Sequence, residues 1–160
     1  MKLSTLIVSY KSITKLEKCL NTIGNIGEIL IIENSDNIEI KKTVESKYKN
    51  CKVIINNDNL GWSKAANIGL NEIKTQYVII LNPDTLIKDN QFIEIENEIK
   101  NLNGNFTLAT PYYDELVDFN KNKDFDKDLN ITKINNNTES KTTKVDLVKG
   151  SALIINLDKF

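Results

Sequence analysis

The chain has 160 residues and a formal charge of −1, with 21 lysines against 22 acidic residues and neither arginine nor histidine. This length accommodates one compact domain but not two, because domains typically run to roughly 100–200 residues. The balanced charge argues against a nucleic-acid partner or a membrane-attracting face, and no apolar run approaches the roughly 20 residues of a membrane-spanning helix. Without histidine or arginine, any chemistry must rest on carboxylates, lysines, amides and backbone.

The two cysteines, Cys19 and Cys51, stand far apart, without CxxC spacing and without a signal peptide ahead of them. We interpret both as reduced thiols; the alternative is a disulfide or a metal role. The expected location is therefore the cytoplasm.

Short apolar runs alternate with segments of helical periodicity along the first two thirds of the chain. Ser12 is a candidate cap for a helix with apolar positions from Ile13 to Ile23, and Gly24 would end that helix. This order predicts an α/β fold with a mostly parallel sheet covered by helices on both faces. The predicted strands lie within 4–10, 28–36, 51–57, 76–84 and 106–113, and the helices within 13–23, 40–48, 62–73 and 90–102.

The character of the chain changes after the fifth predicted strand. Residues 114–143 are rich in Lys, Asn and Asp, and either an ordered excursion or a mobile loop fits this composition. Strand-like sequence returns within 144–160.

Polar side chains follow the predicted strands at the points where the strands end: Ser9-Tyr10, 33–36, 56–58 and 82–84. Ligands of open parallel sheets bind at the carboxyl ends of the strands, so these exits belong to one region. Two carboxylates, Glu33 and Asp84, are expected to converge there. Mg²⁺ or Mn²⁺ ordinarily takes one or two protein carboxylates, with phosphate oxygens and water completing the octahedron. The exits are thus a candidate site for a divalent ion with a diphosphate ligand.

The exit Asn82-Pro83-Asp84 has two interpretations. Pro83 fixes its own φ and restricts Asn82 to extended geometry, which would deliver Asp84 in a defined direction, as a metal ligand requires. The alternative is a plain turn that ends the strand and caps the following helix.

The segment "NLGWSKAANIG" also has two interpretations. Gly61 would let the backbone approach a ligand, the helix start would present N–H groups to an anion, and Lys64 would add a positive charge. Alternatively, its small residues pack a helix closely on the sheet while Lys64 is solvated. Trp62 is either a stacking wall or core, and Glu33 either accepts hydrogen bonds from a nucleobase or ribose or serves as a capping residue.

Four motifs in this order, "STLIVSY", "IIENSD", "NLGWSKAANIGL" and "YVIILNPDT", resemble the donor-binding half of the inverting glycosyltransferases of family 2, particularly the rhamnosyltransferase-like group. The later "VDLVKGSALII" resembles the segment that crosses towards the acceptor side. The resemblance implies a GT-A fold with Mg²⁺ or Mn²⁺, a dTDP- or UDP-linked sugar donor and a glycan or lipid-linked acceptor. It also implies polysaccharide biosynthesis, with peripheral association at the inner face of the membrane as an option.

Carried over to this chain, the resemblance implies one domain over 1–160, with a donor-binding half at 1–112 and a variable, incomplete acceptor side at 113–160. Glu33 stands where the family commonly has an Asp that contacts the base, and Asp84 is the metal ligand of a DxD-like motif. The implied donor-binding residues are Val8, Ser9, Tyr10, Glu33, Asn34, Gly61, Lys64, Asn67 and Asn82.

The chain departs from the family pattern in two ways. Glu33 is longer than the usual Asp by a methylene, which alters the geometry of any base contact. The acidic motif that supplies the catalytic base is expected beyond Phe160, so we expect this chain to lack its base. Two rival interpretations remain: a non-catalytic nucleotide-binding module, and a receiver-type domain with Glu33 and Asp84 in a phosphoacceptor pocket. The lack of paired Asp residues after the first strand and of a later Lys-Pro counts against the second.

Overall fold

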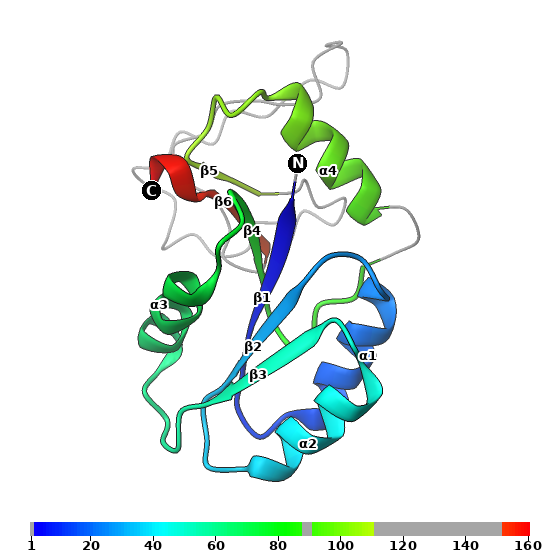
Figure 1. Ribbon diagram of the computed structural model, residues 1–160, viewed down its shortest axis with the longest axis vertical. Coiled ribbons are helices and arrows are strands. Elements are labelled where there is room, and N and C mark those ends of the chain that lie inside the picture. Colours follow the sequence, from blue (N-terminus) through cyan, green and yellow to red (C-terminus); the bar gives the residue numbers. More distant parts are fainter. Residues whose placement is uncertain (1, 88–90, 111–151) are drawn as a thin grey trace, which may run out of the picture.

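The computed structural model describes residues 2–87, 91–110 and 152–160, and over these the chain forms one sheet with the strand order β3-β2-β1-β4-β6-β5 (Figure 1). The predicted segment 114–143 and the predicted boundary between 1–112 and 113–160 lie outside the described residues. The elements are β1 Leu3–Ser9, α1 Ile13–Ile23, β2 Ile29–Glu33, α2 Ile38–Lys47, β3 Cys51–Ile55, α3 Trp62–Glu72, β4 Tyr77–Leu81, α4 Gln91–Asn101, β5 Leu108–Ala109 and β6 Ala152–Asn156.

The central strand β1 pairs in parallel with both β2 and β4, and β2 pairs in parallel with β3. The predicted α/β fold with a mostly parallel sheet is therefore confirmed. The returning strand β6 runs antiparallel to β4 and to β5, an orientation that the sequence analysis did not predict.

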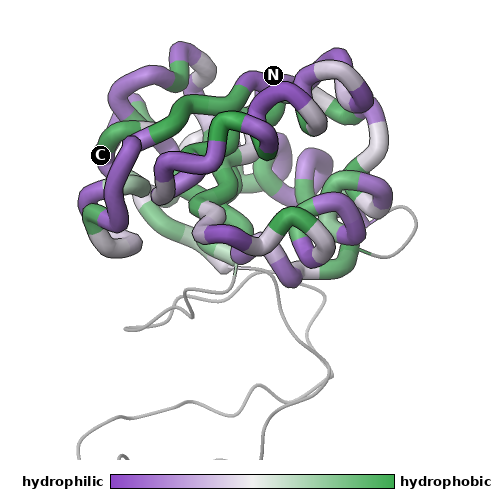
Figure 2. Tube along the Cα trace, turned by 90° about the horizontal axis from the view of Figure 1, so that it is seen from below, coloured by the Kyte–Doolittle hydropathy of each residue, from purple (hydrophilic) through white to green (hydrophobic). Residues whose placement is uncertain are grey.

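The two faces of the sheet carry separate hydrophobic clusters because successive side chains of a strand point to opposite faces. Leu3 and Ile7 of β1 belong to the cluster that packs against α1, α2 and α4, and Leu6 and Val8 belong to the cluster that packs against α3. Figure 1 shows α1 and α2 on one side of the sheet and α3 on the other. Figure 2 shows green, hydrophobic residues along inner segments of the chain and purple, hydrophilic residues on many of its outer turns.

Helix α1 follows the predicted periodicity, and its buried residues are Leu16, Cys19, Leu20 and Ile23. Gly24 ends the helix at φ +66°, and its N–H donates to the Leu20 carbonyl over 2.9 Å. Ser12 stands at the N-cap position, as predicted, and its carbonyl accepts the Leu16 N–H over 2.9 Å. Its side chain makes no capping hydrogen bond, because the Ser12 hydroxyl instead bonds the Ser9 hydroxyl over 3.1 Å.

Helix α2 begins earlier than predicted, at Ile38. The Asn37 side chain accepts a hydrogen bond from the Glu39 N–H over 3.1 Å, which satisfies one of the free N–H groups of the first turn. Farther along the helix, Glu45 lies beside the edge strand β3. Its carboxylate accepts the Val53 N–H over 2.8 Å.

Helix α3 packs against the sheet through the small residues Ala65, Ala66 and Gly69, which are buried. A Cβ built on Gly69 would collide with the Leu6 side chain and lie 3.2 Å from Ile32. Small residues thus set the distance between helix and sheet, which confirms the packing interpretation of this segment.

The last strand is joined to the loop before β5 through a buried amide. The Asn156 side chain donates to the carbonyls of Gly104 and Phe106, each over 3.2 Å. Beside it, the rings of Tyr77 and Phe106 stack with centroids 5.8 Å apart.

Among the described residues, no helix has both the length and the apolar character that crossing a bilayer requires.

Both cysteines are free and buried, as predicted. Burial, with a smaller contribution from the Asp84 carboxylate, raises the pKa of the Cys19 thiol from 9.0 to about 12. Burial raises the pKa of the Cys51 thiol to about 11. Both groups are therefore protonated thiols at neutral pH.

Replacing Gly69 tests the close packing of α3. We expect Gly69→Ala to lower the free energy of unfolding by about 1–3 kcal/mol, because Leu6 must leave its position in a filled core. The exposed Asn71→Ala on the same helix is the matched control, with a change within about 0.5 kcal/mol. Urea denaturation of both variants measures the difference, and equal stabilities would contradict the packing argument.

The raised thiol pKa values predict slow alkylation of the folded protein. The thiolate is the reactive species, so iodoacetamide at pH 8 should label neither Cys19 nor Cys51 until urea unfolds the chain. Above pH 9.0 the unfolded chain binds fewer protons than the folded chain, so the free energy of unfolding should fall as pH rises towards 11 and 12. Below pH 9.0 these thiols should add no pH dependence. Rapid labelling of the native protein would show that a thiol is accessible.

Candidate functional site

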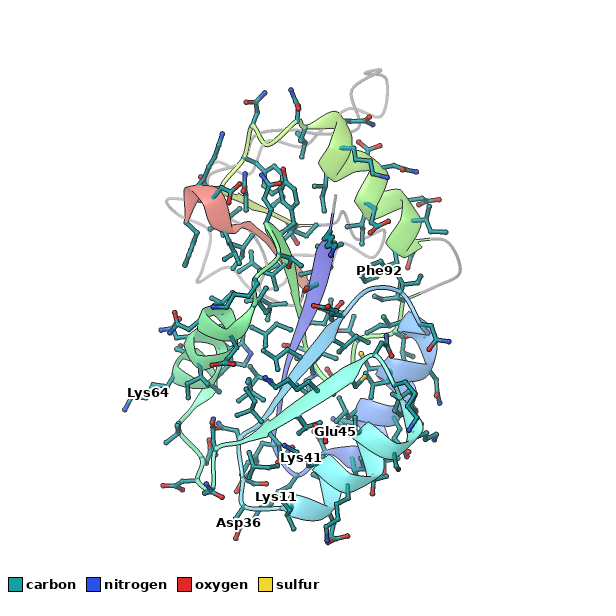
Figure 3. The ribbon with its side chains drawn as sticks, viewed as in Figure 1. Lys11, Asp36, Lys41, Glu45, Lys64 and Phe92 are labelled. Atoms are coloured by element: carbon teal, nitrogen blue, oxygen red, sulfur yellow. The ribbon has the colours of Figure 1, made fainter. Side chains whose placement is uncertain are left out.

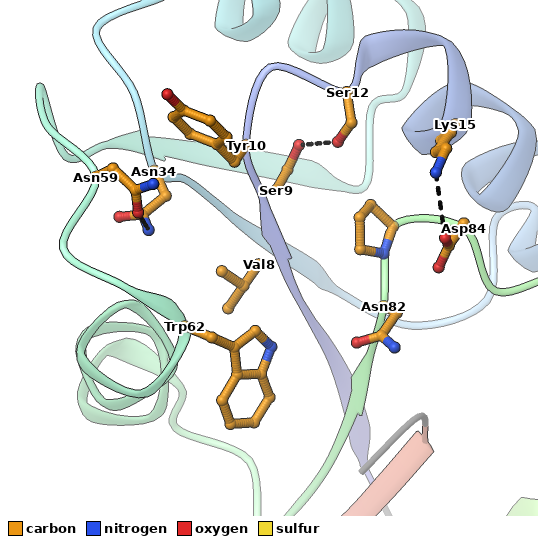
Figure 4. Close-up of a pocket in the computed structure, with 11 residues that line it drawn as sticks. Val8, Ser9, Tyr10, Ser12, Lys15, Asn34, Asn59, Trp62, Asn82 and Asp84 are labelled. Atoms are coloured by element: carbon orange, nitrogen blue, oxygen red, sulfur yellow. Dashed lines mark hydrogen bonds and ion pairs between the residues drawn. The ribbon is translucent and has the colours of Figure 1, made fainter.

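A pocket of about 410 Å³ lies at the carboxyl ends of β1, β2 and β4 (Figure 4). This is the edge at which the sequence predicts ligand binding. Its lining residues are Val8, Ser9, Tyr10, Ser12, Lys15, Asn34, Asn59, Trp62, Asn82, Pro83 and Asp84.

The structure brings only part of the predicted set to this pocket. The predicted residues that line it are Val8, Ser9, Tyr10, Asn34, Asn82 and Asp84. Those that do not line it are Glu33, Gly61, Lys64 and Asn67. The pocket thus lies where the sequence predicted a site, but four of the predicted residues do not line it.

The strand exit after β4 forms a turn that presents Asp84 to the pocket. The Thr85 N–H donates to the Asn82 carbonyl over 3.1 Å, with Pro83 at the second position of the turn, where its fixed φ is favourable. The turn that ends the strand is therefore confirmed, and it leaves Asp84 on the pocket lining. The side chain of Asp84 is 56% exposed.

The carboxylate of Asp84 faces a lysine from α1. Lys15 Nζ lies 3.4 Å from Asp84 Oδ2, although the two residues are 69 positions apart in the sequence. Figure 4 shows this pair on one side of β1, with Trp62, Asn34 and Asn59 on the other side. One end of the pocket is therefore charged and the other presents amides and an indole.

Glu33 lies behind the pocket wall and is fully buried. Its Oε1 accepts hydrogen bonds from the backbone N–H of Lys11, over 3.0 Å, and from the hydroxyl of Ser35. Lys11 has a φ of +48°, a conformation uncommon for a residue with a side chain, and the carboxylate holds its N–H there. Glu33 Oε2 is buried and has no hydrogen-bond partner among the described residues.

Asn34, at the exit of β2, bonds three residues of the loop between β3 and α3. Its Nδ2 donates to Asn59 over 2.8 Å, and its Oδ1 accepts from the Asn56 side chain, over 3.0 Å, and from the Leu60 N–H, over 3.1 Å. These bonds fix the loop between β3 and α3 against the exit of β2. The amide itself is almost fully buried.

The start of α3 contributes a tryptophan rather than a lysine. Gly61 has a φ of +78°, which favours glycine, and its N–H donates to the Asn59 side chain over 3.1 Å. The core interpretation of Trp62 is wrong, because this side chain is 43% exposed and lines the pocket. Lys64 points outward from α3 (Figure 3), and Asn67 is exposed.

Asp84 is the carboxylate that the described lining residues offer to a metal. Among the described residues, no group of three or more His, Cys, Asp or Glu is arranged around a common point. Asp84 alone suits a hard divalent ion that takes a single protein carboxylate and completes its shell with phosphate oxygens and water. The residues present therefore fit Mg²⁺ or Mn²⁺ only together with a phosphate ligand.

Sequence reasoning missed Ser12, Lys15 and Asn59 as lining residues. Asn59 stands within a segment that the motifs already marked, and Ser12 was assigned to helix capping alone. Nothing near Lys15 in the sequence marks it, because only the packing of α1 beside the exit of β4 places it opposite Asp84.

Comparison with known proteins gives a family and a fold. The family model described as glycosyl transferase family 2 matches residues 4–155. The low-salt glycan biosynthesis hexosyltransferase Agl10 of Haloferax volcanii is 28% identical over 97 residues, which is 58% of this chain and 31% of that protein.

Two solved structures share the fold. S. aureus TarS 1–349 in complex with UDP-GlcNAc has a TM-score of 0.55 at 19% identity, over 64% of this chain and 32% of that one. The mannosyltransferase PcManGT from Pyrobaculum calidifontis in complex with GDP-Man and Mn²⁺ has a TM-score of 0.54 at 14% identity, over 63% and 32%. The matched region thus spans about a third of the length of each of these proteins.

The expected GT-A architecture agrees with these neighbours, and the family match extends over nearly the whole sequence. The chain therefore belongs to glycosyl transferase family 2.

Proposed function

We propose that the chain provides the donor-binding part of a metal-dependent, inverting glycosyltransferase that acts on a nucleoside diphosphate sugar, with a glycan or lipid-linked acceptor. The observation that carries this proposal is the pocket at the carboxyl edge of the sheet, in which a single aspartate on a rigid turn stands opposite amide and aromatic side chains. The family membership and the ligands named for the two structural neighbours support it. A dTDP- or UDP-linked donor and a rhamnosyltransferase-like specificity remain our preferred assignments.

The two ends of the pocket suggest how the donor lies. We place the nucleoside beside Tyr10, at the exits of β1 and β2, because its exposed ring suits a planar base. Asn34 holds the adjoining loop in place there. The diphosphate is placed beside Asp84, at the charged end. Trp62 and Asn82 then remain for the sugar.

Mg²⁺ or Mn²⁺ would be held by Asp84 together with oxygens of the diphosphate, in keeping with the single carboxylate of the pocket. Such an ion stabilises the negative charge that grows on the departing nucleoside diphosphate. Asp84 orients the diphosphate end of the donor on its side of the pocket. The turn of Asn82 and Pro83 fixes the direction of its carboxylate. The displacement occurs at the anomeric carbon, with the acceptor hydroxyl deprotonated by a base outside the residues assigned here.

Glu33 acts on the nucleotide through the backbone that it holds. Its carboxylate accepts from Lys11 and Ser35 and does not line the pocket, so we assign it a positioning role in place of the base contact implied by the resemblance. The hydrogen bond to the Lys11 N–H fixes the turn that carries Tyr10 to the pocket edge.

Replacing Asp84 tests the proposed function. We expect Asp84→Asn to weaken Mn²⁺-dependent UDP binding at least tenfold, because the single pocket carboxylate is lost. Stability should change by less than about 1 kcal/mol, since the ion pair that Asp84 makes with Lys15 is exposed. Titration calorimetry with UDP, dTDP and GDP, in Mn²⁺ or in EDTA, measures the effect.

The matched control is Asp158→Asn, which removes an exposed carboxylate far from the pocket. Asp158 follows Asn156, and Asn156 pairs with Tyr77 at the end of β4 opposite the pocket. This variant should bind like the wild type. Unchanged Mn²⁺-dependent binding in Asp84→Asn would refute the assignment of Asp84. No binding of any nucleoside diphosphate by the wild type would refute the proposed function itself.

Two substitutions of Glu33 test its positioning role. Glu33→Ala leaves two donors without their acceptor, and we expect a loss of about 1–3 kcal/mol in stability together with weaker nucleotide binding. Glu33→Gln keeps an oxygen that can accept both hydrogen bonds, so its losses of stability and of nucleotide affinity should be smaller. Calorimetry with UDP, dTDP and GDP should show the same fractional loss for every base, whereas a loss confined to one base would indicate direct contact.

A further inference from the structure

Among the described residues that line the pocket, Lys15 and Asp84 are the charged ones, and they form an ion pair with each other. Lys15 Nζ and Asp84 Oδ2 are 3.4 Å apart, with 64% and 56% of the respective side chains exposed. Lys15 has no second hydrogen-bond partner among the described residues. Figure 4 shows the ammonium group directed at the carboxylate from the side of α1.

The Lys15 ammonium group lies on the carboxylate that a metal ion would use. A divalent ion at Asp84 would bind the same carboxylate whose Oδ2 Lys15 now contacts, so the two cations compete for one negative charge. The pair is exposed and makes a single contact, so little energy holds it together, and a doubly charged ion competes well for the carboxylate. Lys15 is long and flexible enough to remain in the pocket after it is displaced.

We propose that Lys15 exchanges partners during donor binding: it neutralises Asp84 in the empty site and passes to the diphosphate when the metal takes the carboxylate. This inference rests on the proposed function, because it presupposes that Asp84 binds a metal. A diphosphate brings negative charge that Asp84 alone would repel. The metal and the freed ammonium together balance that charge, while the empty site stays neutral through the ion pair.

The exchange gives Lys15 opposite effects on the two ligands. Lys15 weakens binding of the metal alone because the ion must first break the ion pair. It strengthens binding of the nucleoside diphosphate in the presence of metal because the ammonium then donates to phosphate oxygens. Each ligand thus favours the arrangement that the other needs, which makes their binding mutually cooperative.

Neutralising Lys15 separates these effects. In Lys15→Gln we expect Mn²⁺ alone, followed by electron paramagnetic resonance, to bind roughly two- to fivefold more tightly than to the wild type, the size set by an exposed ion pair. In saturating Mn²⁺, UDP measured by calorimetry should bind roughly five- to tenfold more weakly. Lys15→Arg keeps the charge and should restore UDP binding to within about threefold of the wild type.

The control is Lys18→Gln, which removes the same charge from the exposed part of α1 without touching the pocket. It should leave both affinities unchanged. Opposite shifts in Lys15→Gln alone would support the exchange, since a merely structural role would not move the two affinities in opposite directions.

Two results would overturn the inference while leaving the proposed function intact. Unchanged Mn²⁺ affinity in Lys15→Gln would show that the ion pair does not compete with the metal. Unchanged UDP affinity would show that Lys15 does not reach the diphosphate. A wild type that binds neither Mn²⁺ nor UDP would instead refute the proposed function on which the exchange depends.

Discussion

The site depends on the pairing of β1 with two parallel neighbours. Its register places Ser9 beside Glu33 on one side and Ile7 beside Leu81 on the other, so the chain leaves three strands at one edge of the sheet. The backbone ladder, and not any contact with a ligand, fixes where the polar exits meet. The buried carboxylate of Glu33 then locks the first exit to the second, and the turn after β4 completes the rim.

Much of this arrangement could be read from the sequence because it follows from local patterns. Apolar runs and helical periodicity predicted the parallel strands and the helices between them, and Gly24 marked a helix end that needs a positive φ. The direction of β6 was not predictable, since it depends on how the chain returns after residue 110, which no local period records. The Asn37 cap was also missed, because its amide gives the same signal in any turn.

The candidate site was likewise only partly predictable from the sequence. Strand-end polarity located Asp84 and Asn34, whereas Trp62 and Lys15 enter the pocket through the rotation and packing of the helices that carry them. Glu33 shows a different limit of sequence reasoning. A carboxylate at a strand end has the same local pattern whether it faces a ligand or turns inward to hold the backbone, and only the buried donors of Lys11 and Ser35 decide between these.

The contact between Glu45 and Val53 affects how readily the edge strand β3 could pair with another molecule. β3 lies at the end of the strand order, where an unpaired N–H would offer a starting point for a strand from another molecule. The carboxylate already occupies that donor over 2.8 Å and places a negative charge at the border of the sheet. An intruding strand would have to displace the Glu45 carboxylate before it could bond the Val53 N–H, so Glu45 protects this donor from intermolecular pairing.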